Sequence, residues 1–139
     1  MKVDLYADII CPWCYIGEHR FFRAIDQTPG VGPVEVILRP FQLDPTAKEP
    51  RPVLDYLWAK FGDRAEAANR EVGRIAKADG LGWDASRQVV VDTLPAHRVL
   101  RLALVEGGPE LQHKLMQRLY AAHFAEGANV ADPMVLAGI

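Results

Sequence analysis

The sequence predicts an α/β fold in which a strand–helix–strand unit at the amino end is followed by an all-helical region. Two apolar runs, residues 3–10 and 34–38, have the pattern of strands, and the segment 15–26 between them has helical periodicity. From residue 52 onward apolar residues recur at helical spacing, and only 89–91 has a weak strand pattern. Strand, helix and strand within about forty residues indicate a βαβ unit with parallel strands and a right-handed crossover.

Each of the first three elements follows from its local pattern. Val3, Leu5 and Ala7 alternate along the first strand, and the two isoleucines after Asp8 extend it as a mostly buried run. The helix that follows has a wide apolar face, predicted to consist of Trp13, Ile16, Phe21, Phe22 and Ile25. A turn rich in proline and glycine at 29–33 ends this helix and leads into the second strand.

The second part of the chain begins with a proline-spaced loop at 39–52, which is too polar and broken for a strand. Helices are predicted at 53–61 and at 64–78 because their apolar residues follow the helical period. Gly80 is suited to the left-handed cap that ends the second of these helices.

Capping residues and a glycine-rich break define the remaining helices. Asp92 and Thr93 offer an amino-terminal cap, and the segment 107–109, Gly-Gly-Pro, interrupts the helical pattern. The inward faces of the helices before and after this break are predicted to be Val99, Leu100, Ala103 and Leu104, and then Leu111, Leu115, Leu119 and Ala122. Asp132 caps a final short helix.

The composition is that of an ordinary globular protein. Half of the 139 residues are apolar, 24% are charged and the net charge is −2, so neither nucleic acid nor an anionic membrane surface is an expected partner. No apolar stretch approaches the roughly 18–20 residues that a membrane span requires. The amino end leads directly into a strand, without the features of a signal peptide, and we therefore expect a cytoplasmic location.

The most informative motif is a pair of cysteines, Cys11 and Cys14, which are the only two in the chain. They stand where the first strand gives way to a helix, a placement typical of thioredoxin-like redox motifs. Pro12 suits the first helical position, and unpaired N–H groups and the helix dipole should stabilise a thiolate at Cys11. Cys14 lies one turn further on, so it is placed to resolve a mixed disulfide at Cys11. Because Trp13 has no charge, the backbone is expected to do most of this work.

Two other interpretations of the cysteine pair remain open. A structural disulfide would close a very small loop and stabilise the chain by only about 2 kcal/mol. A zinc site normally needs four ligands, and the four histidines show no pair at metal-binding spacing. Those histidines are His19, His97, His113 and His123. Redox chemistry is the interpretation that the spacing favours, and we expect neither a metal nor another cofactor.

The residues around the cysteines resemble a known family. The segment 8–17, with Cys-Pro-Trp-Cys at its centre, resembles the signature of the DsbA-like thioredoxin family, in the branch called FrnE-like. The segments 39–43, 92–98 and 119–129 also resemble that branch, although an asparagine is commoner there than Asp92. The resemblance extends over the whole chain, and the cysteine motif is its specific part.

The resemblance implies a thioredoxin fold with an inserted helical domain and thiol–disulfide oxidoreductase activity. The expected boundaries are 1–50 for the amino-terminal half of the fold and 51–139 for the helical insertion. Relatives continue with further strands, a helix and a cis-proline loop, which this sequence does not show. We therefore expect an open edge at the first strand, which a second copy or another partner chain would complete.

Other residues and other functions follow from the same resemblance. Pro12, Trp13 and His97 are candidate substrate contacts, and Arg39 is expected to form an ion pair. The substrates implied are protein or small-molecule thiols and disulfides. Because Trp13 replaces the basic group of some relatives, Cys11 should be less acidic, and the couple less oxidising, than in those relatives.

Two alternative functions remain open. One alternative is a glutathione-dependent kappa-type isomerase or transferase, against which the two cysteines argue. Another is a non-catalytic interaction module that binds a soft metal through two thiolates.

Overall fold

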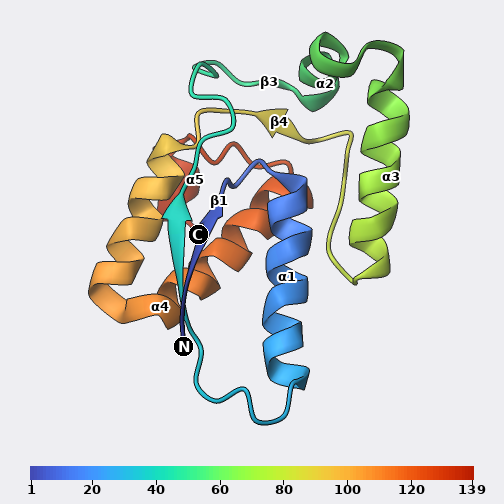
Figure 1. Ribbon diagram of the computed structural model, residues 1–139. Helices are drawn as coiled ribbons and strands as arrows, with labels where there is room; N and C mark the ends of the chain where they lie inside the picture. The colour runs from blue at the N-terminus through green and yellow to red at the C-terminus, as the bar shows by residue number, and fades with distance from the viewer.

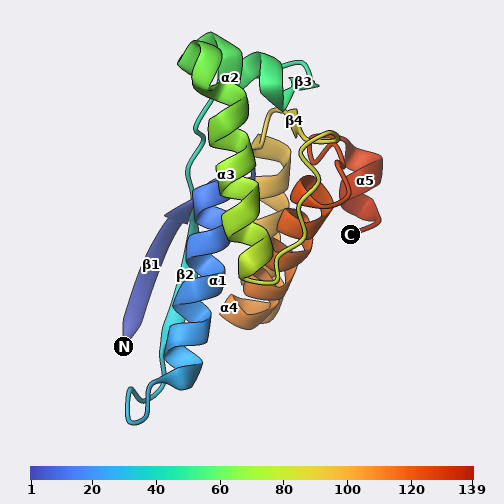
Figure 2. The same ribbon diagram turned by 90° about the vertical axis from the view of Figure 1, so that its right-hand side faces the viewer.

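The structure is a computed structural model that describes residues 1–139 (Figure 1). Its amino-terminal unit consists of strand β1 (Lys2–Ala7), helix α1 (Pro12–Gln27) and strand β2 (Glu35–Pro40). The two strands pair in parallel, with Val3 opposite Val36. The predicted βαβ unit is therefore confirmed, and β2 runs two residues further than its apolar pattern indicates. Figure 2 shows β1 and β2 at one side of the molecule and most of the helices on the other.

The outer edge of β2 is bonded by a glutamine side chain instead of a third strand. Gln112 is buried, and its Oε1 accepts from the Leu38 N–H at 2.9 Å. Its Nε2 donates to the Leu38 carbonyl at 3.0 Å and to the Leu100 carbonyl at 3.3 Å. The side-chain amide of Gln112 offers Leu38 one acceptor and one donor, as the backbone of a neighbouring strand would. It also ties the sheet to the helix that follows Thr93.

Replacing Gln112 by leucine should lower the free energy of unfolding by about 2 kcal/mol. The apolar side chain would leave both backbone groups of Leu38 without partners at a buried position. Urea denaturation measures this loss. Gln117→Leu, at an exposed position of the same helix, should change the free energy of unfolding by less than about 0.5 kcal/mol. Equal effects at the two positions would contradict the bridging role.

The helical region has the predicted order of elements, with one addition. Helices α2 (Val53–Phe61) and α3 (Ala65–Ala78) are joined by a single turn of 3₁₀ helix at Gly62–Arg64. The loop prediction for 39–52 is wrong at its end, because β3 (Arg51–Pro52) pairs antiparallel with β4 (Val89–Val90). A proline is tolerated there because a two-residue edge strand needs few N–H donors.

The predicted break at 107–109 is present as a turn inside one long element. Helix α4 (Leu94–Phe124) bends at Gly108, whose φ of 72° and ψ of −169° are not helical. Only glycine adopts such a conformation readily. Figure 1 shows the two halves of α4 on either side of this turn. The short helix α5 (Pro133–Ala137) is capped by Asp132, as predicted: the Asp132 side chain accepts from the Met134 N–H at 2.8 Å.

Two apolar faces differ from their sequence predictions. Leu111 is exposed, because the bend at Gly108 rotates the second half of α4 and buries Gln112 and Met116 instead. Trp13 is also exposed, at 56%, although the helical pattern places it on the buried face of α1. The buried side of α1 begins at Tyr15 and Ile16.

One hydrophobic core joins the two parts of the chain. It contains side chains from β1, α1 and β2 together with side chains from α3, the 81–91 segment and α4. Its largest fully buried members are Tyr120, Phe124, Ile9, Ile16 and Met116. The division of the chain at residue 50 stays a prediction. None of the helices combines the length and the apolar character that a membrane span requires.

Candidate active site

The cysteine pair lies at the start of α1, directly after β1. Cys11 is the amino-terminal cap of the helix, with an extended backbone (φ −88°, ψ 109°), and Pro12 takes the first helical position, as predicted. The Cys11 N–H donates to the Asp8 carbonyl at 3.1 Å, so the turn between strand and helix is closed by the backbone. This arrangement leaves the Cys11 sulfur beside the free N–H groups of the first helical turn.

The two sulfurs have different acidities. The Cys14 N–H donates to the Cys11 Sγ at 3.3 Å. A hydrogen bond from the Cys14 thiol, followed by N–H groups of Cys14 and Trp13, lowers the pKa of Cys11 to about 7, although burial opposes this. The same hydrogen bond to Cys11, together with burial, raises the pKa of Cys14. Cys11 is therefore the sulfur that ionises first. The largest contribution comes from the partner thiol, whereas the sequence pointed to the backbone.

A buried carboxyl group lies just before the motif. Asp8 is 1% exposed, and its Oδ1 accepts from the Ile9 N–H at 2.8 Å while its Oδ2 accepts from the Leu43 N–H at 2.7 Å. His97, near the start of α4, places its Nε2 3.2 Å from Asp8 Oδ1. Of the predicted site residues, His97 thus contacts the carboxyl group behind the motif and is itself buried. The negative charge of Asp8 raises the pKa of Cys11 and of Cys14.

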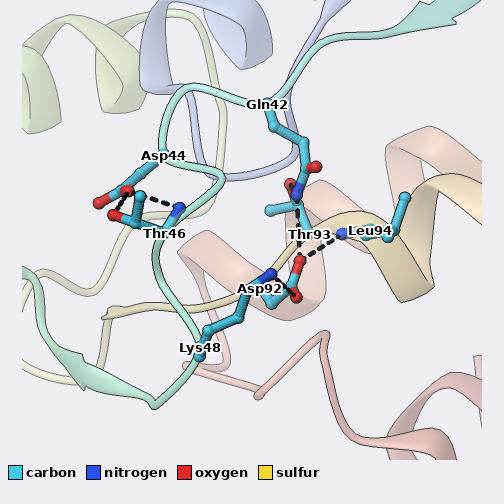
Figure 3. Close-up of polar contacts among 7 residues, drawn as sticks. All are labelled: Gln42, Asp44, Thr46, Lys48, Asp92, Thr93 and Leu94. Carbon is cyan, nitrogen blue, oxygen red and sulfur yellow. Dashed lines mark hydrogen bonds and ion pairs between the residues drawn. The ribbon is translucent and has the colours of Figure 1, made fainter.

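The loop after β2 is attached to the start of α4 through Asp92 (Figure 3). Asp92 Oδ1 accepts from the Gln42 side chain and from the Leu94 N–H, each at 3.0 Å, and Oδ2 pairs with Lys48 at 2.9 Å. The ammonium group of Lys48 lowers the pKa of Asp92, so this carboxylate stays charged. Thr93 takes the N-cap position of α4 without a side-chain cap hydrogen bond, and the Asp92 carboxylate instead accepts from the first N–H of the helix. Asp92, through Gln42 and Lys48, and Asp8, through the Leu43 N–H, fix the loop that carries Leu43 beside the cysteines.

A mostly apolar cavity of about 490 Å³ opens beside Cys11. The motif contributes Ile10, Cys11, Pro12 and Trp13 to its wall, and the opposite wall comes from α2 and α3. Pro12 and Trp13, predicted as substrate contacts, both line it, whereas His97 does not. Sequence reasoning missed the cavity because residues from α2, α3 and the end of α4 meet there only in the folded chain.

Several buried polar groups near the motif were also missed. Glu18, one turn after Cys14, is 3% exposed, and burial raises its pKa to about 8. The Nε2 of His113 lies 3.3 Å from Glu18 Oε1, but the two side chains do not form a well-aligned hydrogen bond, and burial lowers the pKa of His113. A glutamate in the middle of an apolar helix face was the available signal. No group of three or more His, Cys, Asp or Glu side chains that would hold a metal ion is found.

The rate of Cys11 alkylation by iodoacetamide should rise with pH, with a midpoint at about 7, because only the thiolate reacts. In Asp8→Asn the midpoint should move to lower pH, since the charge that disfavours the thiolate is removed. Stopped alkylation followed by peptide mass spectrometry measures both profiles in the protein that keeps both cysteines, because fragmentation distinguishes an adduct on Cys11 from one on Cys14.

Asp4→Asn is the matched control, because Asp4 is an exposed carboxylate of β1, the strand that precedes Asp8, and pairs with Arg39 at 2.7 Å. It should leave the midpoint where it is. A midpoint that is unchanged in Asp8→Asn would show that the carboxyl group does not influence the thiol.

Comparison with known proteins places these features in a family. Residues 2–139 match the DSBA-like thioredoxin domain. A probable DsbA oxidoreductase from Streptomyces coelicolor is 35% identical and superposes with a TM-score of 0.89 over 99% of this chain and 60% of its own. The cytosolic disulfide reductase DsbM from Pseudomonas aeruginosa is 22% identical, with a TM-score of 0.65 over 99% of this chain and 62% of its own. A second DsbM structure contains GSH and gives a TM-score of 0.64.

A search of curated proteins found no match. The chain spans about three fifths of the length of the solved structures that it matches. The family match covers nearly all of the chain. The protein belongs to the DsbA-like thioredoxin family and has its thioredoxin-like fold.

Proposed function

We propose that this protein exchanges thiols and disulfides through the Cys11–Cys14 couple. The observation that carries the proposal is the pair of unequal sulfurs at the helix start, with the pKa of Cys11 lowered to about 7 and that of Cys14 raised. A thiolate that is populated at neutral pH reacts with disulfides, and a thiol held beside it can complete the exchange. Membership of the DsbA-like family supports the same chemistry.

In the proposed reaction the Cys11 thiolate attacks one sulfur of a substrate disulfide. A Cys11–substrate disulfide forms, and the other half of the substrate leaves as a thiolate. Cys14 then attacks Cys11, its proton passes to solvent or to a leaving thiolate, and the second half of the substrate departs. Two electrons move from the protein dithiol to the substrate. Two thiols of the surroundings restore the dithiol by the reverse exchange and leave joined as a disulfide.

The first step prepares the second. The hydrogen bond to Cys11 is the largest cause of the raised pKa of Cys14. That hydrogen bond weakens once Cys11 is bound in a mixed disulfide, because the acceptor is no longer a thiolate. The Cys14 proton is then released more readily, when the thiolate is needed to free the substrate.

The neighbouring residues have supporting roles in this proposal. Pro12 and Trp13 contact the substrate at the cavity, and His97 is a positioning residue that holds Asp8 behind the motif. Substrates are small-molecule or protein thiols and disulfides. A cytoplasmic location and a partner chain at the free edge of β1 stay predictions from the sequence.

The test is to trap the intermediate. Reduced Cys14→Ser protein, mixed with bis(2-hydroxyethyl) disulfide, should accumulate a mixed disulfide at Cys11 that mass spectrometry detects. The reduced wild-type protein should instead end as the internal disulfide, with two substrate thiols released per chain. A Cys14→Ser protein that forms no adduct under conditions in which free cysteine does would refute the proposal.

A further inference from the structure

A second cavity, of about 290 Å³, lies between the end of β2 and the bent helix α4 (Figure 1). It shares no lining residue with the cavity beside Cys11. Its size is close to the lower end of the range of roughly 300–1,000 Å³ that is common for small-molecule sites, so a ligand here must be small. Half of its lining is hydrophobic and consists of Ala7, Leu38, Leu100, Leu104 and Met116.

The buried imidazole of His97 belongs to the lining of this second cavity. Its Nε2 lies 3.2 Å from Asp8 Oδ1. Asp8 also accepts from the N–H groups of Ile9 and Leu43, so its carboxylate acts as an acceptor and Nε2 carries the hydrogen. Nδ1 makes no hydrogen bond, and it is not among the unpartnered polar atoms that the core hides from solvent. A ligand in the second cavity can therefore reach Nδ1.

The charged side chains of the second cavity favour an anion. Arg101 lies four residues after His97, so both are on the same side of α4, and Arg101 is exposed and makes no ion pair. The other cation, Arg39, is paired with Asp4 through its Nε at 2.7 Å. No carboxylate lines the cavity, and the amide of Gln112 is used by β2 and α4. One guanidinium and one ring nitrogen thus remain without partners.

A small carboxylate would satisfy both of these groups. Its oxygens would accept from the guanidinium of Arg101 and from Nδ1 of His97. Because Nε2 already carries a hydrogen for Asp8, Nδ1 can donate only after the ring takes up a second proton, which comes from solvent. The imidazolium would then lie between two carboxylates, that of Asp8 and that of the ligand. Arg39, at the end of β2, is the remaining charged group that faces the cavity.

We propose that the second cavity binds a small aliphatic carboxylate, held by Arg101 and by Nδ1 of His97, and that the bound ligand makes Cys11 more reactive. The aliphatic part lies on the hydrophobic half of the lining. Asp8 connects the two sites, because its negative charge raises the pKa of Cys11 and a doubly protonated His97 opposes that charge. The coupling rests on the reactivity of the thiol and not on the proposed exchange reaction.

Binding is tested with butanoate by NMR chemical-shift titration at pH 7 and constant ionic strength. The wild-type protein should bind butanoate saturably, in the millimolar range expected for so small a ligand. Arg101→Gln should weaken binding by about tenfold or more, because a charged hydrogen-bonding partner is lost. Arg98→Gln removes the same charge from an exposed position of α4 outside the cavity, and it should change the affinity by less than about twofold.

The probes also test the chemical class of the ligand. Butan-1-ol, which has the aliphatic part without the charge, and inorganic phosphate, which has charge without the aliphatic part, should each bind about tenfold more weakly than butanoate. An alcohol or a phosphate that binds as tightly as butanoate would overturn the proposed ligand class. Equal affinities of Arg101→Gln and Arg98→Gln, or no saturable binding to the wild-type protein, would overturn the site.

The role of His97 is tested by the pH dependence of binding. Butanoate should bind at least about fivefold more tightly at pH 6 than at pH 8, because the ring takes up a proton with the ligand, which is itself ionised throughout this range. The titration uses Cys11→Ser, so that ionisation of Cys11 does not contribute. His97→Gln keeps a donor for Asp8 but cannot become charged, and should abolish the pH dependence. An affinity that is already independent of pH with His97 present would overturn its role without any need for the variant.

The coupling to Cys11 is measured by alkylation with iodoacetamide at pH 6. Saturating butanoate should raise the rate by about twofold or more, whereas chloride at the same concentration should not. The same concentration of butanoate should have little effect on Arg101→Gln and the full effect on Arg98→Gln. Binding without a change in the rate would overturn the coupling. A protein that shows the coupling but exchanges no disulfide would refute the proposed function and retain this inference.

Discussion

Replacing Cys11 by serine should reduce the single-turnover rate with bis(2-hydroxyethyl) disulfide by a factor on the order of a thousand or more. A serine hydroxyl is hardly ionised near neutral pH, whereas the Cys11 thiol has its pKa lowered to about 7. The remaining sulfur, Cys14, does not replace it, because burial continues to raise its pKa after the Cys11 thiol is gone. Release of thiol from the substrate, followed by absorbance, measures the rate.

Cys14→Ser is the matched control for this experiment. It keeps the attacking sulfur and should still carry out the first exchange, so that one substrate thiol is released per chain instead of two. In Cys14→Ala, which has no side-chain donor at this position, the pKa of Cys11 should rise, because the hydrogen bond from the Cys14 thiol is its largest stabilising cause. The assignment of roles would be reversed if Cys11→Ser reacted faster than Cys14→Ser.

Replacing Phe124 by alanine should lower the free energy of unfolding by about 3–5 kcal/mol. Phe124 is 2% exposed and stacks between Tyr15 of α1 and Trp83 of the 81–91 segment, with centroid distances of 5.0 and 5.2 Å. Its removal would leave a cavity where three parts of the chain meet. A loss of this size is a large fraction of the roughly 5–15 kcal/mol that stabilises a typical domain.

Urea denaturation monitored by circular dichroism measures this change. Leu102→Ala is the control, because Leu102 belongs to the same helix but is 56% exposed, and it should cost less than about 0.5 kcal/mol. Phe124→Leu, which fills part of the space, should fall between the two. A cost below about 1 kcal/mol for Phe124→Ala would show that the aromatic stack is not a main source of stability.

The amino-terminal part of the fold was predictable because its signals are local. The alternation of Val3, Leu5 and Ala7 indicates a strand, and Pro12 suits the first position of a helix because it lacks an N–H and has a helical φ. The turn at Gly108 was predictable for the same reason, since a Gly-Gly-Pro sequence interrupts a helix whatever surrounds it. The spacing of Cys11 and Cys14 identified the candidate redox pair.

The wrong predictions of buried helix faces have one common cause: which face is buried depends on contacts between segments that are distant in the sequence. Trp13 follows the helical pattern of the α1 core but is exposed, because the buried side of the helix is chosen by Tyr15 and its packing against α4. Leu111 follows the pattern of α4 but is exposed, because the bend turns Gln112 towards β2. Periodicity shows that a helix has two faces, and it does not show which partner will cover one of them.

The sequence by itself determined the family, the order of the helices and of the first two strands, and the two sulfurs, because these are encoded in short stretches whose meaning does not depend on the rest of the chain. Tertiary structure alone decided which carboxyl group lies behind the motif, which amide completes the sheet edge, and which side chains enclose the cavity. Asp8 meets His97, and Leu38 meets Gln112, across 89 and 74 positions of sequence. Such pairs form only when burial of the core brings their elements together, so local sequence patterns do not predict them.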